Sequence, residues 1–221
     1  MIRVVLADDE VMIRAGVRAV LAVDPEIEVV AEAGDGRTAI DLVQRFRPDV
    51  AVLDIRMPGT DGIRAMAEIR RTVPGTGVVV LTTFGDDDHI LRALSGGAGG
   101  FLVKSGEPEE LIAGVRAVAE GAAYLPPTIA ARVIAHLAAT GAGGATDRRA
   151  AARRQVATLT DREREVLALL TLGLANGQIA RRLSVAEGTV KAHVSSILAR
   201  LGVPNRAAAA VTAHEAGLTT P

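Results

Sequence analysis

The sequence predicts an α/β fold of the (βα)5 type, a doubly wound parallel sheet, followed by a C-terminal all-α domain. Five short apolar segments alternate with helical patterns over roughly the first 120 residues, and no strand pattern follows residue 158. Charge divides in the same place, since residues 1–125 carry a net charge of −7 and residues 148–221 carry +6. We therefore expect two domains, 1–122 and 158–221, joined by a helix and a flexible linker over 123–157.

Composition limits the class of protein. The chain has 221 residues, 49% of them hydrophobic, and no cysteine, which excludes disulfides and thiolate metal sites. No apolar run approaches the roughly 20 residues that span a bilayer, and the N-terminus leads directly into a strand pattern. We expect a cytoplasmic protein without membrane association. A polyanion is the natural partner of the basic half.

The expected strands are short and apolar. They cover residues 2–7, 28–33, 49–53, 77–81 and 100–103, with helical patterns near 11–22, 36–46, 61–71, 87–95 and 108–120. Right-handed crossovers would place helices on both faces of the sheet and bring all strand ends to one edge. In open α/β sheets this edge is where ligands bind.

Carboxylates follow two of these strands. Asp54 ends the run Val-Ala-Val-Leu-Asp, which Pro58-Gly59 closes with a turn, while Asp8 and Asp9 follow the first strand. A plainer interpretation makes Asp54 the start of a loop and one of the other two a helix cap. Several carboxylates at one edge repel one another unless a hard cation neutralises them, and Mg²⁺ accepts carboxylates together with water and phosphate oxygens. The pattern favours a Mg²⁺ site over capping alone.

Two more polar groups stand at the same edge. The fourth strand ends in Thr82 and the fifth in Lys104, and each alone is an ordinary surface residue type. Of the 25 basic residues, however, 23 are Arg, and only Lys104 and Lys191 are Lys. A compact ammonium on a flexible stem follows a phosphoryl group in a tight site better than a planar guanidinium does.

The first domain resembles the receiver domain of response regulators. The resemblance lies in Asp8-Asp9, the segment Asp-Ile-Arg-Met-Pro-Gly-Thr-Asp-Gly that begins at Asp54, and Thr82 and Lys104 in the same order. It implies that a sensor histidine kinase phosphorylates Asp54. The other implied roles are as follows: Asp9, Asp54 and the backbone carbonyl of Arg56 as Mg²⁺ ligands, Asp8 as a ligand through water, Thr82 and Lys104 as phosphoryl-binding groups, and Phe101 as the switch aromatic.

A rival site lies after the second strand. Gly34-Asp35-Gly36 opens a helix and has Asp54 about 20 residues further on, as a dinucleotide-binding fingerprint would. Against it, a pyrophosphate there would lie near Asp8 and Asp9, and the fingerprint normally follows the first strand. We expect no dinucleotide site.

The second half is predicted to be helical and to follow a linker. Pro126-Pro127 opens an apolar helical pattern to residue 137, and residues 140–157 have no core pattern, so we expect a flexible coil spanning roughly 20–25 Å. Helices follow near 161–172, 176–182, 186–201 and 205–216. Thr160 to Glu163 and Ser184 to Glu187 both have the spacing of capping boxes.

The third of these helices has two contrasting faces. Its apolar stripe consists of Val190, Val194, Ile197, Leu198 and Leu201, whereas the opposite face is small and nearly uncharged, with Gly188, Ala192, Ser195 and Ala199 beside Lys191. A helix that enters a DNA groove needs small residues for close approach. A four-helix interaction module with a solvated basic surface is the alternative.

The helical half resembles the LuxR-type helix-turn-helix. Leu159 to Leu167, Leu174 to Ala180 and Gly188 to Val194 carry this resemblance. Together with the receiver, the chain is similar to the NarL/FixJ class of transcription regulators. The resemblance implies double-stranded DNA as partner, RNA polymerase as a further candidate, and a homodimer on phosphorylation or on DNA. The implied DNA-contacting residues are Thr189, Lys191, Ala192 and Ser195.

The resulting prediction is a two-component response regulator, not an enzyme. Phosphorylation at Asp54 would control DNA binding and transcription. An aspartyl-phosphate hydrolase is one alternative, but it needs an acid–base carboxylate two residues after the nucleophile, and position 56 is Arg. An interaction module that works without phosphorylation is the other.

Overall fold

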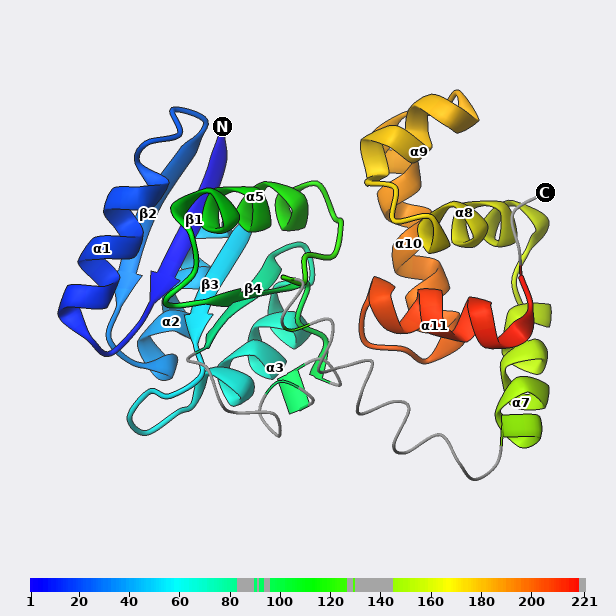
Figure 1. Cartoon of the computed structure of the whole chain (residues 1–221), viewed down its shortest axis with the longest axis horizontal. Coiled ribbons are helices and arrows are strands. Elements are labelled where there is room, and N and C mark those ends of the chain that lie inside the picture. Colours follow the sequence, from blue (N-terminus) through cyan, green and yellow to red (C-terminus); the bar gives the residue numbers. More distant parts are fainter. Residues whose placement is uncertain (83–89, 91, 94–95, 127–128, 130–144, 219–221) are drawn as a thin grey trace. The chain divides into compact units, whose positions relative to one another are not determined.

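A five-stranded parallel sheet in the order β2-β1-β3-β4-β5 organises the first half of the computed structural model (Figure 1). The predicted α/β class and all five strands are confirmed, with strand ends displaced by at most one residue. The strands are β1 (Ile2–Ala7), β2 (Ile27–Ala33), β3 (Val50–Asp54), β4 (Gly77–Thr82) and β5 (Gly100–Val103). Every residue of β3 is buried, as the apolar run predicted for a central parallel strand.

The structure describes residues 1–82, 90, 92–93, 96–126, 129 and 145–218, with the side chains of 145–148 left aside. Most of the helical patterns expected at 87–95 and 126–137 therefore lies outside the described residues. Within them, four helices cover the sheet: α1 (Val11–Leu21), α2 (Gly36–Phe46), α3 (Gly62–Thr72) and α5 (Pro108–Ala119). Helix α1 packs beside α5 and α2 beside α3, on opposite faces (Figure 1).

Two of these helices begin at aspartates that cap them. Asp35 accepts a hydrogen bond from Thr38 N at the start of α2, and Asp61 accepts one from Arg64 N at the start of α3, each at 2.8 Å. A Cβ at Gly36 would lie 2.2 Å from the carbonyl oxygen of Thr60, so close packing between backbones requires this glycine. Capping and packing thus account for the segment that resembled a dinucleotide fingerprint.

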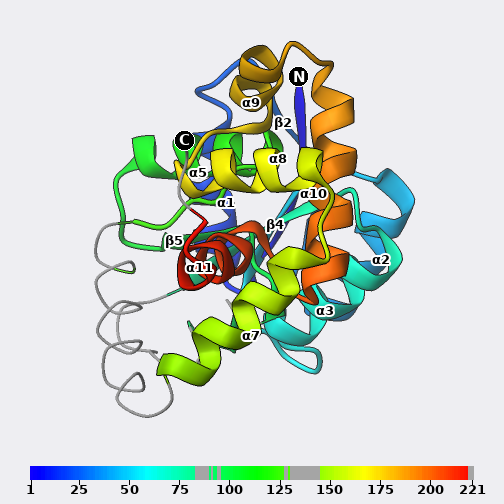
Figure 2. The same cartoon turned by 90° about the vertical axis from the view of Figure 1, so that its right-hand side faces the viewer.

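In the described residues of the second half there are five helices and no strand (Figure 2). They are α7 (Ala145–Ala157), α8 (Asp161–Thr171), α9 (Asn176–Leu183), α10 (Glu187–Leu201) and α11 (Arg206–Ala216). Their apolar faces share one core, which includes Leu167, Ile179, Val190, Ile197, Leu201 and Ala209. The predicted all-α domain is confirmed, and none of the described helices is long and apolar enough to cross a membrane.

The expectation of a flexible coil over 140–157 was wrong for its second part, because α7 spans Ala145–Ala157. Alanine, arginine and glutamine are strong helix formers. Helix α7 packs along α11, buries Ala152 and Val156, and donates a hydrogen bond of 2.9 Å from Gln155 Nε2 to the carbonyl oxygen of Leu201. Tertiary contacts therefore hold this segment in the helical second half. The sequence pattern did not reveal these contacts.

One of the two expected capping boxes is present. Thr160 and Glu163 cap α8 reciprocally, as predicted. Ser184, in contrast, ends α9 in the left-handed conformation with φ 53°, and Ala186 is the residue before α10, without a side-chain cap. The second capping box was wrong, because the turn between α9 and α10 uses Ser184 to reverse the chain.

Glu163 also joins α8 to α10. Its carboxylate accepts hydrogen bonds from Ser196 Oγ (2.6 Å) and Thr160 N (2.8 Å) and lies 3.4 Å from Arg200 Nε. The side chain is 5% exposed. The hydrogen bond from Ser196 and that from the Thr160 backbone lower the pKa of Glu163 to about 2. A buried, charged and fully paired carboxylate at this position stabilises the helical unit.

We expect Glu163→Gln to destabilise the helical unit by about 1–3 kcal/mol at pH 7, since charge-assisted hydrogen bonds become neutral ones. Because the folded-state pKa is depressed, the stabilisation is present above the unfolded pKa and is lost as pH falls towards about 2. Urea unfolding of wild type and variant at pH 7 and pH 3 measures both effects. Glu165→Gln, which removes only an exposed pair with Arg162, is the control. Equal midpoints for Glu163→Gln and wild type at pH 7 would contradict this role.

Candidate functional site

The acidic residues lie where the strand order reverses. Strand β1 has β2 on one side and β3 on the other, so the chain turns in opposite directions after these strands and leaves a crevice at their carboxyl ends. Asp8 and Asp9 follow β1, and Asp54 ends β3. One carboxylate oxygen from each of the three lies within 4.8 Å of the others. The predicted convergence of these carboxylates is therefore present.

Asp8 is the most constrained of the three. It is fully buried, its N–H donates to the Ala33 carbonyl (3.1 Å), and its Oδ1 accepts from Glu10 N (2.9 Å). Its Oδ2 lies 2.8 Å from Lys104 Nζ as an ion pair. Among the described residues, no other donor reaches this buried oxygen. A buried carboxylate oxygen that is paired with a single ammonium can also hold a cation or an ordered water.

Lys104 reaches the site from the end of β5. Its Nζ lies 2.8 Å from Asp8, 3.1 Å from Asp54 and 3.3 Å from Glu10, and its side chain is 7% exposed. Burial lowers the pKa of Lys104, but the pairing with Asp8 and Asp54 outweighs it and raises the pKa above its ordinary value. Lys104 is therefore a buried ammonium held by carboxylates.

At Asp54, burial has a larger effect on the pKa than the pairing with Lys104 does. Burial raises the pKa of its carboxyl, and although Lys104 lowers it, the net shift remains upward, with Asp8 as a further raising charge. Three carboxylates, those of Asp8, Glu10 and Asp54, pair with one ammonium, and the carboxylate of Asp9 lies close to those of Asp8 and Asp54, so the site carries excess negative charge. A second cation would relieve this imbalance, and Mg²⁺ accepts carboxylate oxygens of this kind together with water.

A pocket of about 240 Å³ opens beside Asp54. Its lining consists of Asp9, Glu10, Asp54, Ile55, Arg56, Thr82 and Lys104. Thr82 is buried at the end of β4, and its carbonyl accepts the Lys104 N–H at 2.9 Å. The structure thus brings Asp9, Asp54, Arg56, Thr82 and Lys104 to one cavity large enough for a phosphoryl group and a hydrated ion.

Phe101 is placed differently. It is fully buried on β5 opposite Val80 and is not part of the lining of this pocket. Two residues separate it from Lys104 along the chain, so β5 connects Phe101 to the site. Its predicted switch role stays a prediction.

Two contributions to the site were missed from the sequence. A Cβ at Gly62 would lie 1.9 Å from the Asp54 carbonyl oxygen, so only glycine lets α3 begin this close to the acidic residue. Glu10, which follows Asp9 in the sequence, pairs with Lys104. The Asp61-Gly62 pair in the sequence indicated the start of a helix at Gly62. The contact between Gly62 and Asp54 could not be predicted, because it depends on the fold.

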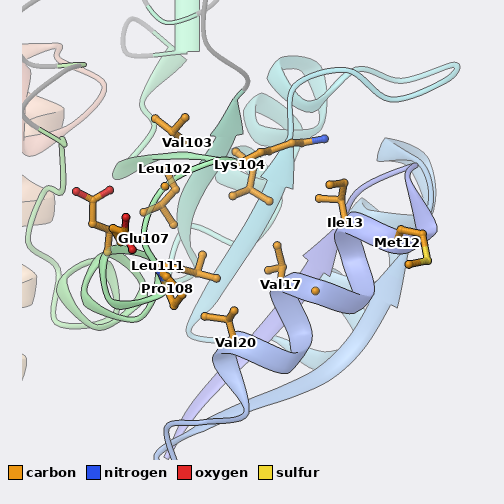
Figure 3. A pocket seen from close by; sticks show the side chains of 14 residues that line it. Met12, Ile13, Val17, Val20, Leu102, Val103, Lys104, Glu107, Pro108 and Leu111 are labelled. Carbon is orange, nitrogen blue, oxygen red and sulfur yellow. The ribbon is translucent and has the colours of Figure 1, made fainter.

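A second pocket, of about 170 Å³, lies between α1 and α5 and shares Lys104 with the first (Figure 3). Its walls are mainly apolar and include Met12, Ile13, Val17, Leu102 and Leu111. Val11 and Met12 at the start of α1 are 65% and 82% exposed. An apolar surface therefore borders the entrance to the acidic site.

The surface of α10 has the predicted character. Thr189, Lys191, Ala192 and Ser195 are all exposed, whereas Val190, Ile197 and Leu201 are buried. Lys191 Nζ lies 3.1 Å from Glu187 Oε1 one turn earlier. The sequence-based description of this face, which placed Lys191 beside it, was incomplete because Glu187 pairs with Lys191. Small and exposed side chains still leave this face open to a groove.

Two protein families match the two halves separately. The family described as response regulator receiver domain matches residues 4–116, and the one described as bacterial regulatory proteins, luxR family, matches residues 157–213. The first match contains the acidic crevice and the second contains α8 to α10.

Several relatives match this chain over nearly its whole length. The DNA-binding transcriptional activator DevR/DosR of Mycobacterium tuberculosis is 40% identical over 223 residues, which cover 100% of this chain and 98% of the relative. The nitrate/nitrite response regulator protein NarL of Escherichia coli is 35% identical and covers 96% of this chain and 94% of its own. Among solved structures, the response regulator ChrA of a heme-sensing two-component system matches with 36% identity, 98% coverage of both chains and a TM-score of 0.54.

Proposed function

Because the chain belongs to the two-component response regulators that join a receiver domain to a LuxR-family DNA-binding domain, we propose that phosphorylation of Asp54 switches its binding to DNA. Its relatives are transcriptional regulators, so the hydrolase alternative is set aside, and the LuxR-family match replaces the interaction module. A histidine kinase and DNA are the partners that this family implies. The observation that carries the proposal is the convergence of Asp54 and Lys104 on one buried crevice.

Asp54 is the nucleophile in this proposal. Its carboxylate ends a rigid, fully buried strand and borders the pocket, where an incoming phosphoryl group can approach in line. Lys104 Nζ is already 3.1 Å from Asp54, and Thr82 lines the same pocket. Lys104 and Thr82 would hold phosphoryl oxygens, and the charge on Lys104 would stabilise the negative charge that develops during transfer.

Mg²⁺ fits the donor set of the crevice. Asp9, Asp54 and the backbone carbonyl of Arg56 would hold the ion, and Asp8 would hold it through water. A bound Mg²⁺ would screen the carboxylates from the incoming phosphate and stabilise charge on the transferred group. The support is the excess of carboxylates over ammonium groups and the close approach of the Asp8, Asp9 and Asp54 carboxylates.

Phosphorylation would change the contacts of Lys104 and Thr82. Lys104 would exchange a carboxylate partner for a phosphoryl oxygen, and Thr82 would be drawn towards the same group. Both residues adjoin paired segments of β4 and β5, on which Phe101 is buried. We assign Phe101 the role of responding to the movement of Thr82 and Lys104. Its ring is closely packed, so a displacement of the neighbouring strand ends would change the packing around it.

The surface beside the acidic crevice suits a protein partner. The kinase must bring a phosphohistidine to Asp54. The α1–α5 pocket, which Met12 lines, shares Lys104 with the acidic pocket (Figure 3), and the apolar side chains of Val11 and Met12 are exposed. Apolar area of this kind stabilises a complex when water leaves it. We therefore assign kinase docking to this face.

DNA binding is assigned to α10. Thr189, Lys191, Ala192 and Ser195 would face a major groove, because their side chains are exposed and small residues permit close approach. Arg181, Arg182 and Arg200 are exposed on or near the same helices and supply positive charge for phosphate contacts. RNA polymerase is the further partner through which bound regulator would change transcription.

We expect phosphorylation to shift the chain from monomer towards homodimer, because two linked DNA-binding units gain affinity for a two-part operator through effective concentration. Light scattering before and after addition of acetyl phosphate with Mg²⁺ measures the mass. The Asp54→Asn variant, which lacks the acceptor, is the control. An unchanged mass together with unchanged DNA affinity would contradict the switch.

Genome-wide mapping of bound DNA with and without phosphoryl donor tests the function as a whole. We expect a limited set of sites sharing a two-part motif, with occupancy raised by the donor. Occupancy without any shared motif would contradict sequence-specific regulation.

A further inference from the structure

We propose that Arg14 is a positioning residue for the cation site, holding the backbone of Asp8 so that Asp8 and Asp9 face Asp54. The inference rests on the proposed function, because it concerns the Mg²⁺ that the crevice would bind. Arg14 lies on the first turn of α1 and does not line the acidic pocket. It acts through the backbone of Asp8.

The contacts of Arg14 connect two strand ends. Its Nη1 donates a 2.6 Å hydrogen bond to the Asp8 carbonyl oxygen at the end of β1, and its Nε donates one of 3.2 Å to Glu32 Oε2 near the end of β2. The side chain is 18% exposed, compared with 57% for Arg18, which pairs with the other oxygen of Glu32. Arg14 is thus a brace between β2 and the segment that carries the acids.

The brace matters because Asp8 has little else to hold its carbonyl. Its N–H is held by Ala33 and its Oδ1 by Glu10 N, which fix one side of the residue. The Asp8 carbonyl is part of the peptide that continues to Asp9, whose exposed carboxylate must point towards Asp54. Fixing that peptide plane limits where the Asp9 carboxylate can lie. Outer partners of this type orient metal ligands and influence metal affinity.

The chemistry favours a guanidinium at this position. Two acceptors in different directions, a carbonyl and a carboxylate, are reached at once by the fork of an arginine and not by a single ammonium. The positive charge also lies near the acidic segment without occupying the cation site. It therefore reduces the repulsion among the carboxylates while leaving them free for the ion.

Arg14→Gln and Arg18→Gln form a matched pair for the test. Each removes one arginine partner of Glu32, but only Arg14→Gln removes the hydrogen bond to Asp8. Isothermal titration of the full-length chain with Mg²⁺ measures affinity without any phosphoryl transfer. We expect Arg14→Gln to weaken Mg²⁺ binding roughly 10-fold, and Arg18→Gln to bind as wild type does. Saturating Mg²⁺ should restore the rate of phosphate uptake in Arg14→Gln.

Arg14→Lys keeps the charge and one donor, so we expect its affinity to lie between those of wild type and Arg14→Gln. Urea unfolding without Mg²⁺ shows whether each variant is folded, and Arg14→Lys replaces Arg14→Gln if the latter is not. Wild-type Mg²⁺ affinity in the variant used, or an equal loss in Arg18→Gln, would overturn the inference. Absence of Mg²⁺ binding by the wild-type chain would instead overturn the proposed cation site.

Discussion

Asp54→Asn is expected to take up no acid-labile phosphate from acetyl phosphate, whereas the wild-type chain takes up one phosphoryl group. An amide is not a nucleophile at this position. The remaining acids do not replace Asp54, because Asp8 pairs with Lys104 and Asp9 is assigned to the metal ion. Labelled acetyl phosphate with Mg²⁺, followed by acid and base treatment of the product, measures uptake. Asp61→Asn is the matched control, because asparagine caps α3 as well as aspartate does.

Loss of uptake in Asp54→Asn must not come from unfolding. Burial raises the pKa of Asp54, so the ionised carboxylate destabilises the folded state. This destabilisation appears as pH rises above the unfolded-state pKa and is complete above the folded-state pKa. A neutral amide lacks that cost. Without Mg²⁺ we therefore expect the stability of the variant, relative to wild type, to be higher at pH 7 than at pH 4. A folded Asp54→Asn chain that still takes up label would show that another residue is the acceptor.

Lys191→Ala is expected to weaken operator binding by roughly 1–3 kcal/mol and to relax specificity at one position of each half-site. The reason is that Lys191 is the cation next to the small, exposed face of α10 and can reach a guanine edge. In the free protein it is paired with Glu187 at 3.1 Å, an exposed ion pair that contributes roughly 0.3–0.5 kcal/mol and is easily exchanged for DNA. Competition binding with operator and scrambled DNA at two salt concentrations measures the effect.

Glu187→Gln is the companion variant. It leaves Lys191 in place and removes a carboxylate beside the DNA face, so we expect tighter binding to operator and scrambled DNA alike. If Lys191→Ala weakens both DNAs equally and lowers the salt slope by about 1, Lys191 contacts phosphate and the assignment of a base contact is wrong.

Much of the acidic site was predictable because it depends on strand order. Parallel strands open on one edge, so carboxylates placed after the first and third strands had to converge, and the structure confirms this for Asp8, Asp9 and Asp54. The pairing of Lys104 with Glu10, the contact of Gly62 with Asp54 and the brace formed by Arg14 depend on side-chain geometry across elements. Periodicity carries no information about such contacts.

The failures in the helical half have local causes. The segment that became α7 lacks a periodic apolar stripe, and its helix is fixed by packing of Ala152 and Val156 against the neighbouring helices. Ser184 has the spacing of a helix start, but the tight turn after α9 needed a left-handed residue there first. The pairing of Glu187 with Lys191, in contrast, was visible in the sequence as an i, i+4 pair.

The central claim is that phosphorylation of Asp54 controls DNA binding. Its most direct test is the affinity of the full-length chain for an operator fragment, measured by fluorescence anisotropy with and without acetyl phosphate and Mg²⁺, in wild type and in Asp54→Asn. We predict that the donor increases the affinity of the wild type and leaves that of Asp54→Asn unchanged. An equal change in both proteins, or no change in the phosphorylated wild type, would contradict the claim.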